Sequence, residues 1–339
     1  MGYINYYATE SAYLADKNSL PKPNVCLADD TGEVFFNEDN SNEKVITSTT
    51  NPGVMAICYA KGWAAHEDYM TAAECAAVTS LDDAFKGSAI TSFDELQYFT
   101  GLTGNLYQQF VSCTALTSII VPEGITSLSW TFRSCSNLKS VHLPNTLTSI
   151  GERAFDGCTG LETINLPSSL TSIGEWAFDD CTGLETINIP SSLTLIGGHN
   201  DKSFGVRNLT IDSGNTSFVL IGGVMYNTGK TTIYYYIDNL PSYNIEEGVT
   251  TVPEDFLDGV TTLNAITLPS TLTSIPDFTL RTRVSPSITC KATTPPSIGQ
   301  QTFYSQPNIL PKIYVPAASV STYQSATNWS KFTIQAIPE

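Results

Sequence analysis

The sequence contains little charge and very little positive charge. Only 14% of the 339 residues are charged, about half the share in an average soluble protein. The 16 basic residues stand against 33 acidic ones, which gives a net charge of −17. Nucleic-acid binding needs Lys and Arg to displace counterions from phosphates, so the composition excludes a nucleic-acid partner and argues against docking on anionic lipid. No apolar run reaches the roughly 18 residues of a membrane span, so no membrane insertion is predicted.

Residues that serve catalysis or metal binding are also scarce. The three histidines, His66, His142 and His199, are far apart, and no H-E-x-x-H, G-x-S-x-G or Gly-rich phosphate-binding motif occurs. Glu162 and Glu185 share one position of a repeat, whereas glycosidases need two carboxyl groups facing each other across a cleft. The sequence therefore predicts a protein that is not an enzyme, with no cofactor and no metal site.

An internal repeat organises most of the chain. Residues 138–160 and 161–183 are nearly identical 23-residue units, residues 116–137 are a 22-residue version, and residues 184–198 begin a further copy. The consensus is L-x-x-I-x-L-P-x-x-L-T-x-I-G-x-x-A-F-x-x-C-x-x. Weaker copies are found at 90–115, 245–262, 263–284 and 287–306. A fixed period of this length is typical of a solenoid.

Each unit has the apolar pattern of one solenoid coil. Two short extended segments and a tight turn at Gly174 are followed by a helical or 3₁₀ turn that closes the coil. The inward positions are Leu161, Ile164, Leu166, Leu170, Ile173, Ala177, Phe178 and Cys181. One unit cannot bury its own apolar face, but stacked units can, since each contacts its neighbours. This predicts parallel strands, one per 22–23-residue coil, around a continuous core.

Four cysteines follow the same period. Because free Cys behaves as a small hydrophobic residue, they predict a structural column of buried thiols in the core, one per coil. The column consists of Cys113, Cys135, Cys158 and Cys181.

The LPSSLTSIGEWAFDDC stretch resembles the BspA-like leucine-rich repeats of surface proteins from gut and oral Bacteroidetes. The resemblance covers about residues 81–306, and residues 294–329 are similar to the C-terminal end of that class. It implies an α/β leucine-rich-repeat solenoid, β-rich, with an N-terminal β-containing cap and a C-terminal helical cap. Pro316 would begin the capping helix over Ala317 to Ala326. The resemblance further implies an extracellular or cell-surface protein that adheres to host proteins or glycans.

The domain organisation follows from where the repeat begins and ends. We predict an N-terminal β-hairpin module or anchor at 1–65, a solenoid at 66–306 with a β-hairpin insertion at about 209–244, and a C-terminal cap at 307–339. Residues 1–16 lack a basic and apolar leader pattern, so they are not expected to act as a secretory signal.

Local patterns within the N-terminal part predict four elements. Val25–Leu27 and Val34–Phe36 predict a hairpin, and Val54–Tyr59 a short strand. Thr71–Val78, with Glu74 at its third position, predicts a helix with a capping box. The opening residues also resemble a leader of phage or prophage virion-associated proteins, which keeps a virion location with virion proteins as partners open.

Outward strand positions are the predicted ligand-binding residues. They are polar and uncharged, which suits a host protein or glycan bound through many hydrogen bonds: Ser140, His142, Thr163, Asn165, Thr186 and Asn188. An alternative contact surface is the aromatic group Tyr226, Tyr234 and Tyr236, because Tyr is favoured at interfaces. The preferred hypothesis is a non-enzymatic recognition or adhesion protein. The alternatives are a virion structural or receptor-binding protein attached by its N-terminal segment and, least favoured, an enzyme.

Overall fold

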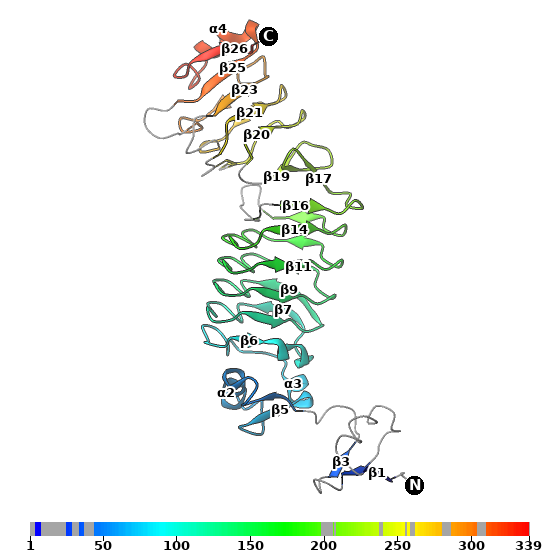
Figure 1. Cartoon of the computed structure of the whole chain (residues 1–339). Helices are drawn as coiled ribbons and strands as arrows, with labels where there is room; N and C mark the ends of the chain where they lie inside the picture. The colour runs from blue at the N-terminus through cyan, green and yellow to red at the C-terminus, as the bar shows by residue number, and fades with distance from the viewer. Residues whose placement is uncertain are drawn as a thin grey trace.

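The computed structural model is an elongated stack of coils (Figure 1). It describes residues 44–197, 206, 208–236, 240–254, 256–257, 262–279, 286–303 and 310–338. Within residues 1–43 it describes the backbone of 4–7, 25–28 and 34–36. The predicted virion attachment falls on this N-terminal segment, and its side chains lie outside the described residues, as does His199.

Two parallel ladders run along the first part of the stack. The first has the order β12-β10-β8-β6 and continues as the pair β14–β16, and the second has the order β15-β13-β11-β9-β7. Ser118 pairs with Ser140 and Ser140 with Thr163, which are offsets of 22 and 23 residues. The predicted solenoid of parallel strands, one per coil, is confirmed. The first-ladder strands are β6 (Ser92–Phe93), β8 (Ser118–Ile120), β10 (Ser140–His142), β12 (Thr163–Ile164), β14 (Thr186–Ile189) and β16 (Asn208–Ile211). The second-ladder strands are β7 (Gly104–Tyr107), β9 (Ile125–Ser129), β11 (Ser149–Ile150), β13 (Ser172–Ile173) and β15 (Leu195–Ile196).

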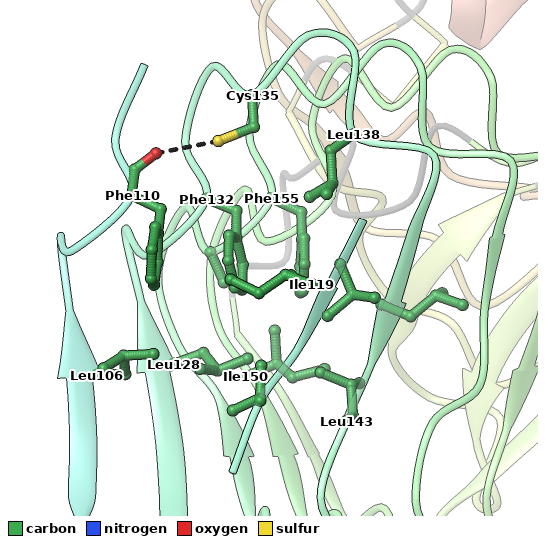
Figure 2. Packing of buried hydrophobic residues seen from close by; sticks show 14 of the residues in the cluster. Leu106, Phe110, Ile119, Leu128, Phe132, Cys135, Leu138, Leu143, Ile150 and Phe155 are labelled. Carbon is green, nitrogen blue, oxygen red and sulfur yellow. Dashed lines mark hydrogen bonds between the residues drawn. The ribbon is translucent and has the colours of Figure 1, made fainter. Parts of the chain in front are cut away.

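A column of phenylalanine rings fills the centre of these coils. Each ring stacks on the one in the next coil, with centroid separations of 5.6, 5.6, 5.3 and 5.3 Å and interplanar angles of 30°, 13°, 19° and 3°. Figure 2 shows three of these rings above a row of leucine and isoleucine side chains. Every ring is fully buried, so the column excludes water along its length. Its members are Phe85, Phe110, Phe132, Phe155 and Phe178.

The four repeat cysteines are buried beside this column and carry free thiols. Each thiol donates a hydrogen bond to the carbonyl oxygen of the phenylalanine one coil earlier. The Sγ···O distances are 2.8, 3.0, 3.1 and 3.2 Å for Cys113 to Phe85, Cys135 to Phe110 (Figure 2), Cys158 to Phe132 and Cys181 to Phe155. The thiol therefore fills core volume and gives a second hydrogen bond to a carbonyl that already accepts from the backbone N–H three residues further on.

Close packing between coils explains the repeated glycine. Gly174 was predicted to permit a tight turn, but its φ is not in the left-handed region. A Cβ atom there would lie 2.6 Å from the Glu152 nitrogen and 2.7 Å from the Gly151 carbonyl carbon of the preceding coil. Glycine is needed because the two backbones approach closely, not because of the turn.

The N-terminal part contains both confirmed and wrong local predictions. β2 (Val25–Ala28) and β3 (Val34–Phe36) pair antiparallel as predicted, and β1 (Ile4–Tyr7) adds a parallel strand to β2. The predicted helix is α3 (Ala72–Ala77), and its capping box is present: the Thr71 side chain accepts from the Glu74 backbone, and the Glu74 side chain accepts from Thr71. β4 (Lys44–Thr47) pairs antiparallel with β5 (Tyr69–Thr71). The 3₁₀ helix η1 (Asp94–Tyr98) follows β6.

The predicted strand at 54–59 is wrong, because these residues lie in helix α2 (Pro52–Ala60). Pro52 stands at the start of this helix, where its fixed φ suits the first turn. The buried side chains are Val54, Met55 and Cys58. This spacing of one and three residues places them on one face of a helix and would put them on opposite faces of a strand.

The predicted hairpin insertion is a three-stranded antiparallel sheet that occupies a shorter segment. Leu209–Ile211 belong to β16, and residues 242–244 form β20 (Ser242–Asn244), so both pair in the parallel ladders. Between them lie β17 (Phe218–Ile221), β18 (Val224–Asn227) and β19 (Ile233–Tyr236). The buried residues of the chain form two cores, one in each block of coils. Because side chains alternate along a strand, Met225 and Tyr235 pack in the N-terminal core, and the C-terminal core receives Val224, Tyr226 and Ile233. The sheet therefore closes both cores.

A second block of coils ends in a small helical cap. Tyr323 on α4 (Val320–Ser325) donates from its hydroxyl to the Ala292 carbonyl at 2.8 Å, and the Trp329 indole donates to the Pro296 carbonyl at 2.8 Å. These buried anchors confirm the predicted C-terminal helical cap, which begins as the 3₁₀ helix η2 (Ala317–Ser319). The ladder of this block has the order β20, β21 (Ala265–Leu268), β23 (Ser287–Cys290), β25 (Lys312–Val315) and β26 (Ile334–Ala336). The second ladder pairs β22 (Ser274–Ile275) with β24 (Ser297–Ile298).

Truncating the phenylalanine column should be costly at its centre. We expect Phe155→Ala to lower the free energy of unfolding by about 3–5 kcal/mol, the usual cost of emptying a buried Phe site. Phe155→Leu should cost clearly less, because Leu257 holds the same repeat position, buried, in the second block. Urea denaturation followed by circular dichroism measures both. If both variants lost the same free energy of unfolding, the volume of the side chain at position 155 would not be what stabilises the column.

The buried thiols should make stability fall at alkaline pH. Burial raises the pKa of Cys158 to about 12 and that of Cys181 well above its ordinary value. Unfolded thiols ionise near pH 9, so from about pH 9 to 12 the unfolded state releases protons that the folded state keeps, and the free energy of unfolding falls as pH rises. Urea titrations between pH 7 and 11 test this.

The matched control is Cys158→Ser with Cys181→Ser. Serine keeps a hydroxyl donor, and Ser88 already stands at the cysteine position of the coil that contains Phe85. The variant should lose part of the alkaline slope. An unchanged slope would show that other groups cause the decline.

Candidate ligand-binding surface

The predicted binding residues lie together on the outer face of the first ladder. Ser140 is paired with Ser118 and Thr163 in adjacent strands, and His142 is paired with Ile120. Buried Val141 and Ile164 occupy the intervening positions, so alternation turns the polar residues outward. All six are exposed: Ser140, His142, Thr163, Asn165, Thr186 and Asn188. We call these six residues the strand-face row.

The hydrogen-bonding capacity of the row differs along its length. The Asn188 amide donates to Asp212 Oδ1 at 2.7 Å and accepts from Thr210 Oγ1 at 2.8 Å, so it is engaged within the protein. For the side chains of His142 and Asn165, no hydrogen bond is found with any residue that the structure describes. The imidazole of His142 and the amide of Asn165 are therefore available to a ligand, whereas the amide of Asn188 is not.

Charge is sparse along this face. Lys139 and Glu162 flank the row and approach to 3.5 Å, with side chains 64% and 65% exposed. An ion pair so open to solvent contributes little to stability. It balances the charges beside Ser140 and Thr163, whereas Glu185 and Asp212 keep negative charge next to Thr186 and Asn188.

The alternative aromatic surface is mostly core. Tyr226 is fully buried, and its hydroxyl accepts a hydrogen bond from the Glu246 backbone at 3.2 Å. Burial raises the pKa of Tyr226 to about 12. Tyr236 is half-buried and packs edge-on against Tyr243 and Phe256, and Tyr234 packs edge-on against Phe218. Tyr226 cannot act as a surface contact, because its side chain lies in the core of the second block.

A polar row in the second block was missed by the sequence reasoning. Register pairs Asn244, Thr267, Thr289, Tyr314 and Gln335 side by side across five strands. These positions alternate with buried Ile266, Ile288 and Ile313, so they occupy the same outward position as the strand-face row. The sequence did contain a signal for this row. The intact LPSTLTSI motif begins at Leu268, the last residue of β21, and so fixes which residues of that strand point outward.

Among the described residues, no three His, Cys, Asp or Glu side chains gather in a way that could hold a metal ion. His66 stacks on Tyr69 at 4.2 Å between ring centroids, far along the chain from His142. In the part of the chain that the structure describes, no helix is long and apolar enough to cross a membrane.

Solved structures with a similar fold come from bacterial leucine-rich-repeat proteins. The protein from Bacteroides ovatus is 20% identical, with a TM-score of 0.45, and the match covers 69% of this chain and 64% of that one. The protein from Eubacterium ventriosum is 20% identical with a TM-score of 0.45 over 66% and 73% of the two chains. A leucine-rich cell surface protein from Faecalibacterium prausnitzii is 20% identical with a TM-score of 0.41 over 73% and 83%.

The chain thus spans about two thirds of the Bacteroides ovatus protein. No curated protein matches it. The model of the BspA type leucine-rich-repeat region matches in six copies, at residues 105–219 and 229–336. These segments cover most of the chain and coincide with the two blocks of coils, so the chain belongs to the BspA-type leucine-rich-repeat family.

Proposed function

We propose that this chain is a non-enzymatic recognition protein that binds a host protein or glycan through the strand-face row. A repeat solenoid supplies a flat sheet whose outward side chains can change without disturbing the core. The location we propose is outside the cell, as for the surface proteins that the sequence resembles.

The exposed and unpaired polar groups of the row carry this proposal. His142 and Asn165 lie on neighbouring coils, where parallel strands are about 4.8 Å apart. Side chains held at that spacing by a rigid sheet can hydrogen-bond to one ligand with little further loss of conformational freedom. Ser140 and Thr163 add hydroxyl groups in the same register.

Removing the unpaired groups should weaken binding without unfolding the coils. We expect His142→Ala with Asn165→Ala to lower affinity about tenfold or more, because each lost hydrogen bond is worth about 0.5–1.5 kcal/mol. The measurement is surface plasmon resonance with the full chain over immobilised mucin and extracellular-matrix proteins. A control with Thr148→Ala and Thr171→Ala changes exposed hydroxyls near the second ladder and should bind normally.

Unchanged binding by the His142/Asn165 variant would remove the row as the site. Hydrolysis of a glycan or peptide that a single substitution abolishes would overturn the non-enzymatic assignment itself.

A further inference from the structure

A second surface feature lies just after the strands of the second ladder. The residue two before each column phenylalanine has a left-handed backbone in five successive coils, with φ between +51° and +58°. The backbone N–H groups of Trp130 and Arg153 donate to carbonyls of the next coil, at 2.8 and 3.0 Å, and so hold this geometry. Bulky side chains are uncommon in this region of backbone space. The five residues are Asp83, Gln108, Trp130, Arg153 and Trp176.

The bulk of these side chains is not required by the backbone. A second left-handed position, two residues after each phenylalanine, carries Gly87, Ser112, Ser134, Gly157 and Asp180. Small and turn-forming residues therefore suffice for such a geometry in the same coils. Two of the four tryptophans of the chain nevertheless occupy the first position.

Trp130, Arg133, Arg153 and Trp176 form a stacked ridge, here called the Trp–Arg ridge. The Arg153 guanidinium carbon lies 5.2 Å from the Trp130 ring centroid and 4.5 Å from that of Trp176. The Arg133 guanidinium carbon lies 5.1 Å from the Trp130 ring. Both indoles are half-buried, so each keeps part of its ring in solvent.

The cations of the ridge are already balanced. Asp156 Oδ2 accepts from Arg133 Nε at 3.1 Å and from Arg153 at 2.8 Å, and the Asp156 side chain is only 13% exposed. Glu152 and Glu175 beside the ridge are exposed. In a chain of net charge −17, this arrangement repels an acidic ligand. It offers carboxylate acceptors and guanidinium donors next to aromatic surface.

The ridge is too narrow for a stable protein interface. Such an interface buries about 800 Å² on each partner, with a large apolar centre. The described residues include five large exposed hydrophobic side chains; of these, Tyr107 directly precedes Gln108, and Leu195 lies on the coil after that of Trp176. The combination of indole surface and paired polar groups suits a small ligand with one apolar face and many hydroxyl groups.

We propose that the Trp–Arg ridge binds a neutral oligosaccharide. The C–H face of a pyranose ring packs on an indole, while its hydroxyl groups donate to Glu152 and Glu175 and accept from the guanidinium groups. Trp130 and Trp176 are two coils apart, roughly 10 Å at the strand spacing of a sheet, so one short oligosaccharide spans both. This site lies away from the strand-face row and does not depend on it.

The test is a glycan array of neutral and acidic oligosaccharides probed with the full chain. Neutral members that bind are then titrated while tryptophan fluorescence is recorded. Neutral binding should protect the half-buried indoles from acrylamide quenching. Trp130→Asn with Trp176→Asn should weaken it at least tenfold, because Asn accepts the left-handed backbone and removes the ring. Trp176→Tyr, which keeps an aromatic ring, should bind within about threefold of the parent chain if stacking carries the affinity.

Tyr98→Asn is the matched control, because it removes an exposed aromatic ring on η1, outside both the ridge and the strand-face row, and it should leave neutral binding unchanged. His142→Ala with Asn165→Ala, the strand-face variant, separates the two proposed sites, because the loss assigned to the ridge should follow the tryptophan variant. Circular dichroism checks that each variant is folded, and the quenching measurement on the parent chain stands even where a variant fails. The proposal is overturned if no neutral oligosaccharide binds, if acidic members bind better, or if the loss follows the strand-face variant instead of the tryptophan variant.

Discussion

The hydrogen bonds between parallel strands fix the distance between coils, and the other regular features of the molecule depend on that distance. Strands in a sheet lie about 4.8 Å apart, so a side chain repeated every 22 or 23 residues meets its own copy. Phenylalanine satisfies this condition by stacking at 5.3–5.6 Å between ring centroids. Gly151 and Gly174 satisfy it by having no side chain where successive backbones approach. The core is therefore a set of columns.

The same condition explains the low charge of the chain. A charged residue copied into consecutive coils would face a like charge at roughly one strand spacing, where repulsion is worth about 1 kcal/mol even in water. Serine and threonine avoid that cost, and their hydroxyls can bond along the stack. Thr148 and Thr171, for example, each donate to the threonine carbonyl one coil earlier, at 3.1 and 3.0 Å. The predominance of uncharged polar residues is thus a consequence of repeating the same residue types in successive coils.

Sequence reasoning succeeded where the repeat is exact and failed where contacts cross the repeat. The parallel register could be predicted because Leu, Ile and Phe recur with one period. The role of Gly174 could not, since it depends on atoms of another coil. The helix at Pro52–Ala60 was missed because Val54 and Ile57 favour strands locally, while packing of Met55 and Cys58 decides the outcome. The third strand of the insertion was missed because its turn residues were assigned to one hairpin.

Surface function is less predictable from the repeat than the core, for a physical reason. Core positions must match their copies, whereas outward positions are free to differ, as His142 and Asn165 do. The consensus marks them only as variable, so their exposure can be predicted but their ligand cannot. The position of Trp130, Arg153 and Trp176 was variable in the same sense, and only the left-handed backbone and the stacking distances single it out.

The Trp–Arg ridge also avoids the repulsion that arises when the same charged residue recurs in successive coils. Three arginines in consecutive coils would repel one another, but here the arginine alternates with tryptophan, so Arg153 lies between two aromatic faces. Each cation–π contact of this kind is worth about 0.5–1 kcal/mol at an exposed site, and Asp156 ties Arg153 to Arg133 of the preceding coil. The contacts that fix the side chains against one another also hold the exposed part of each indole in one orientation. A ligand that meets them loses less entropy than it would on mobile side chains.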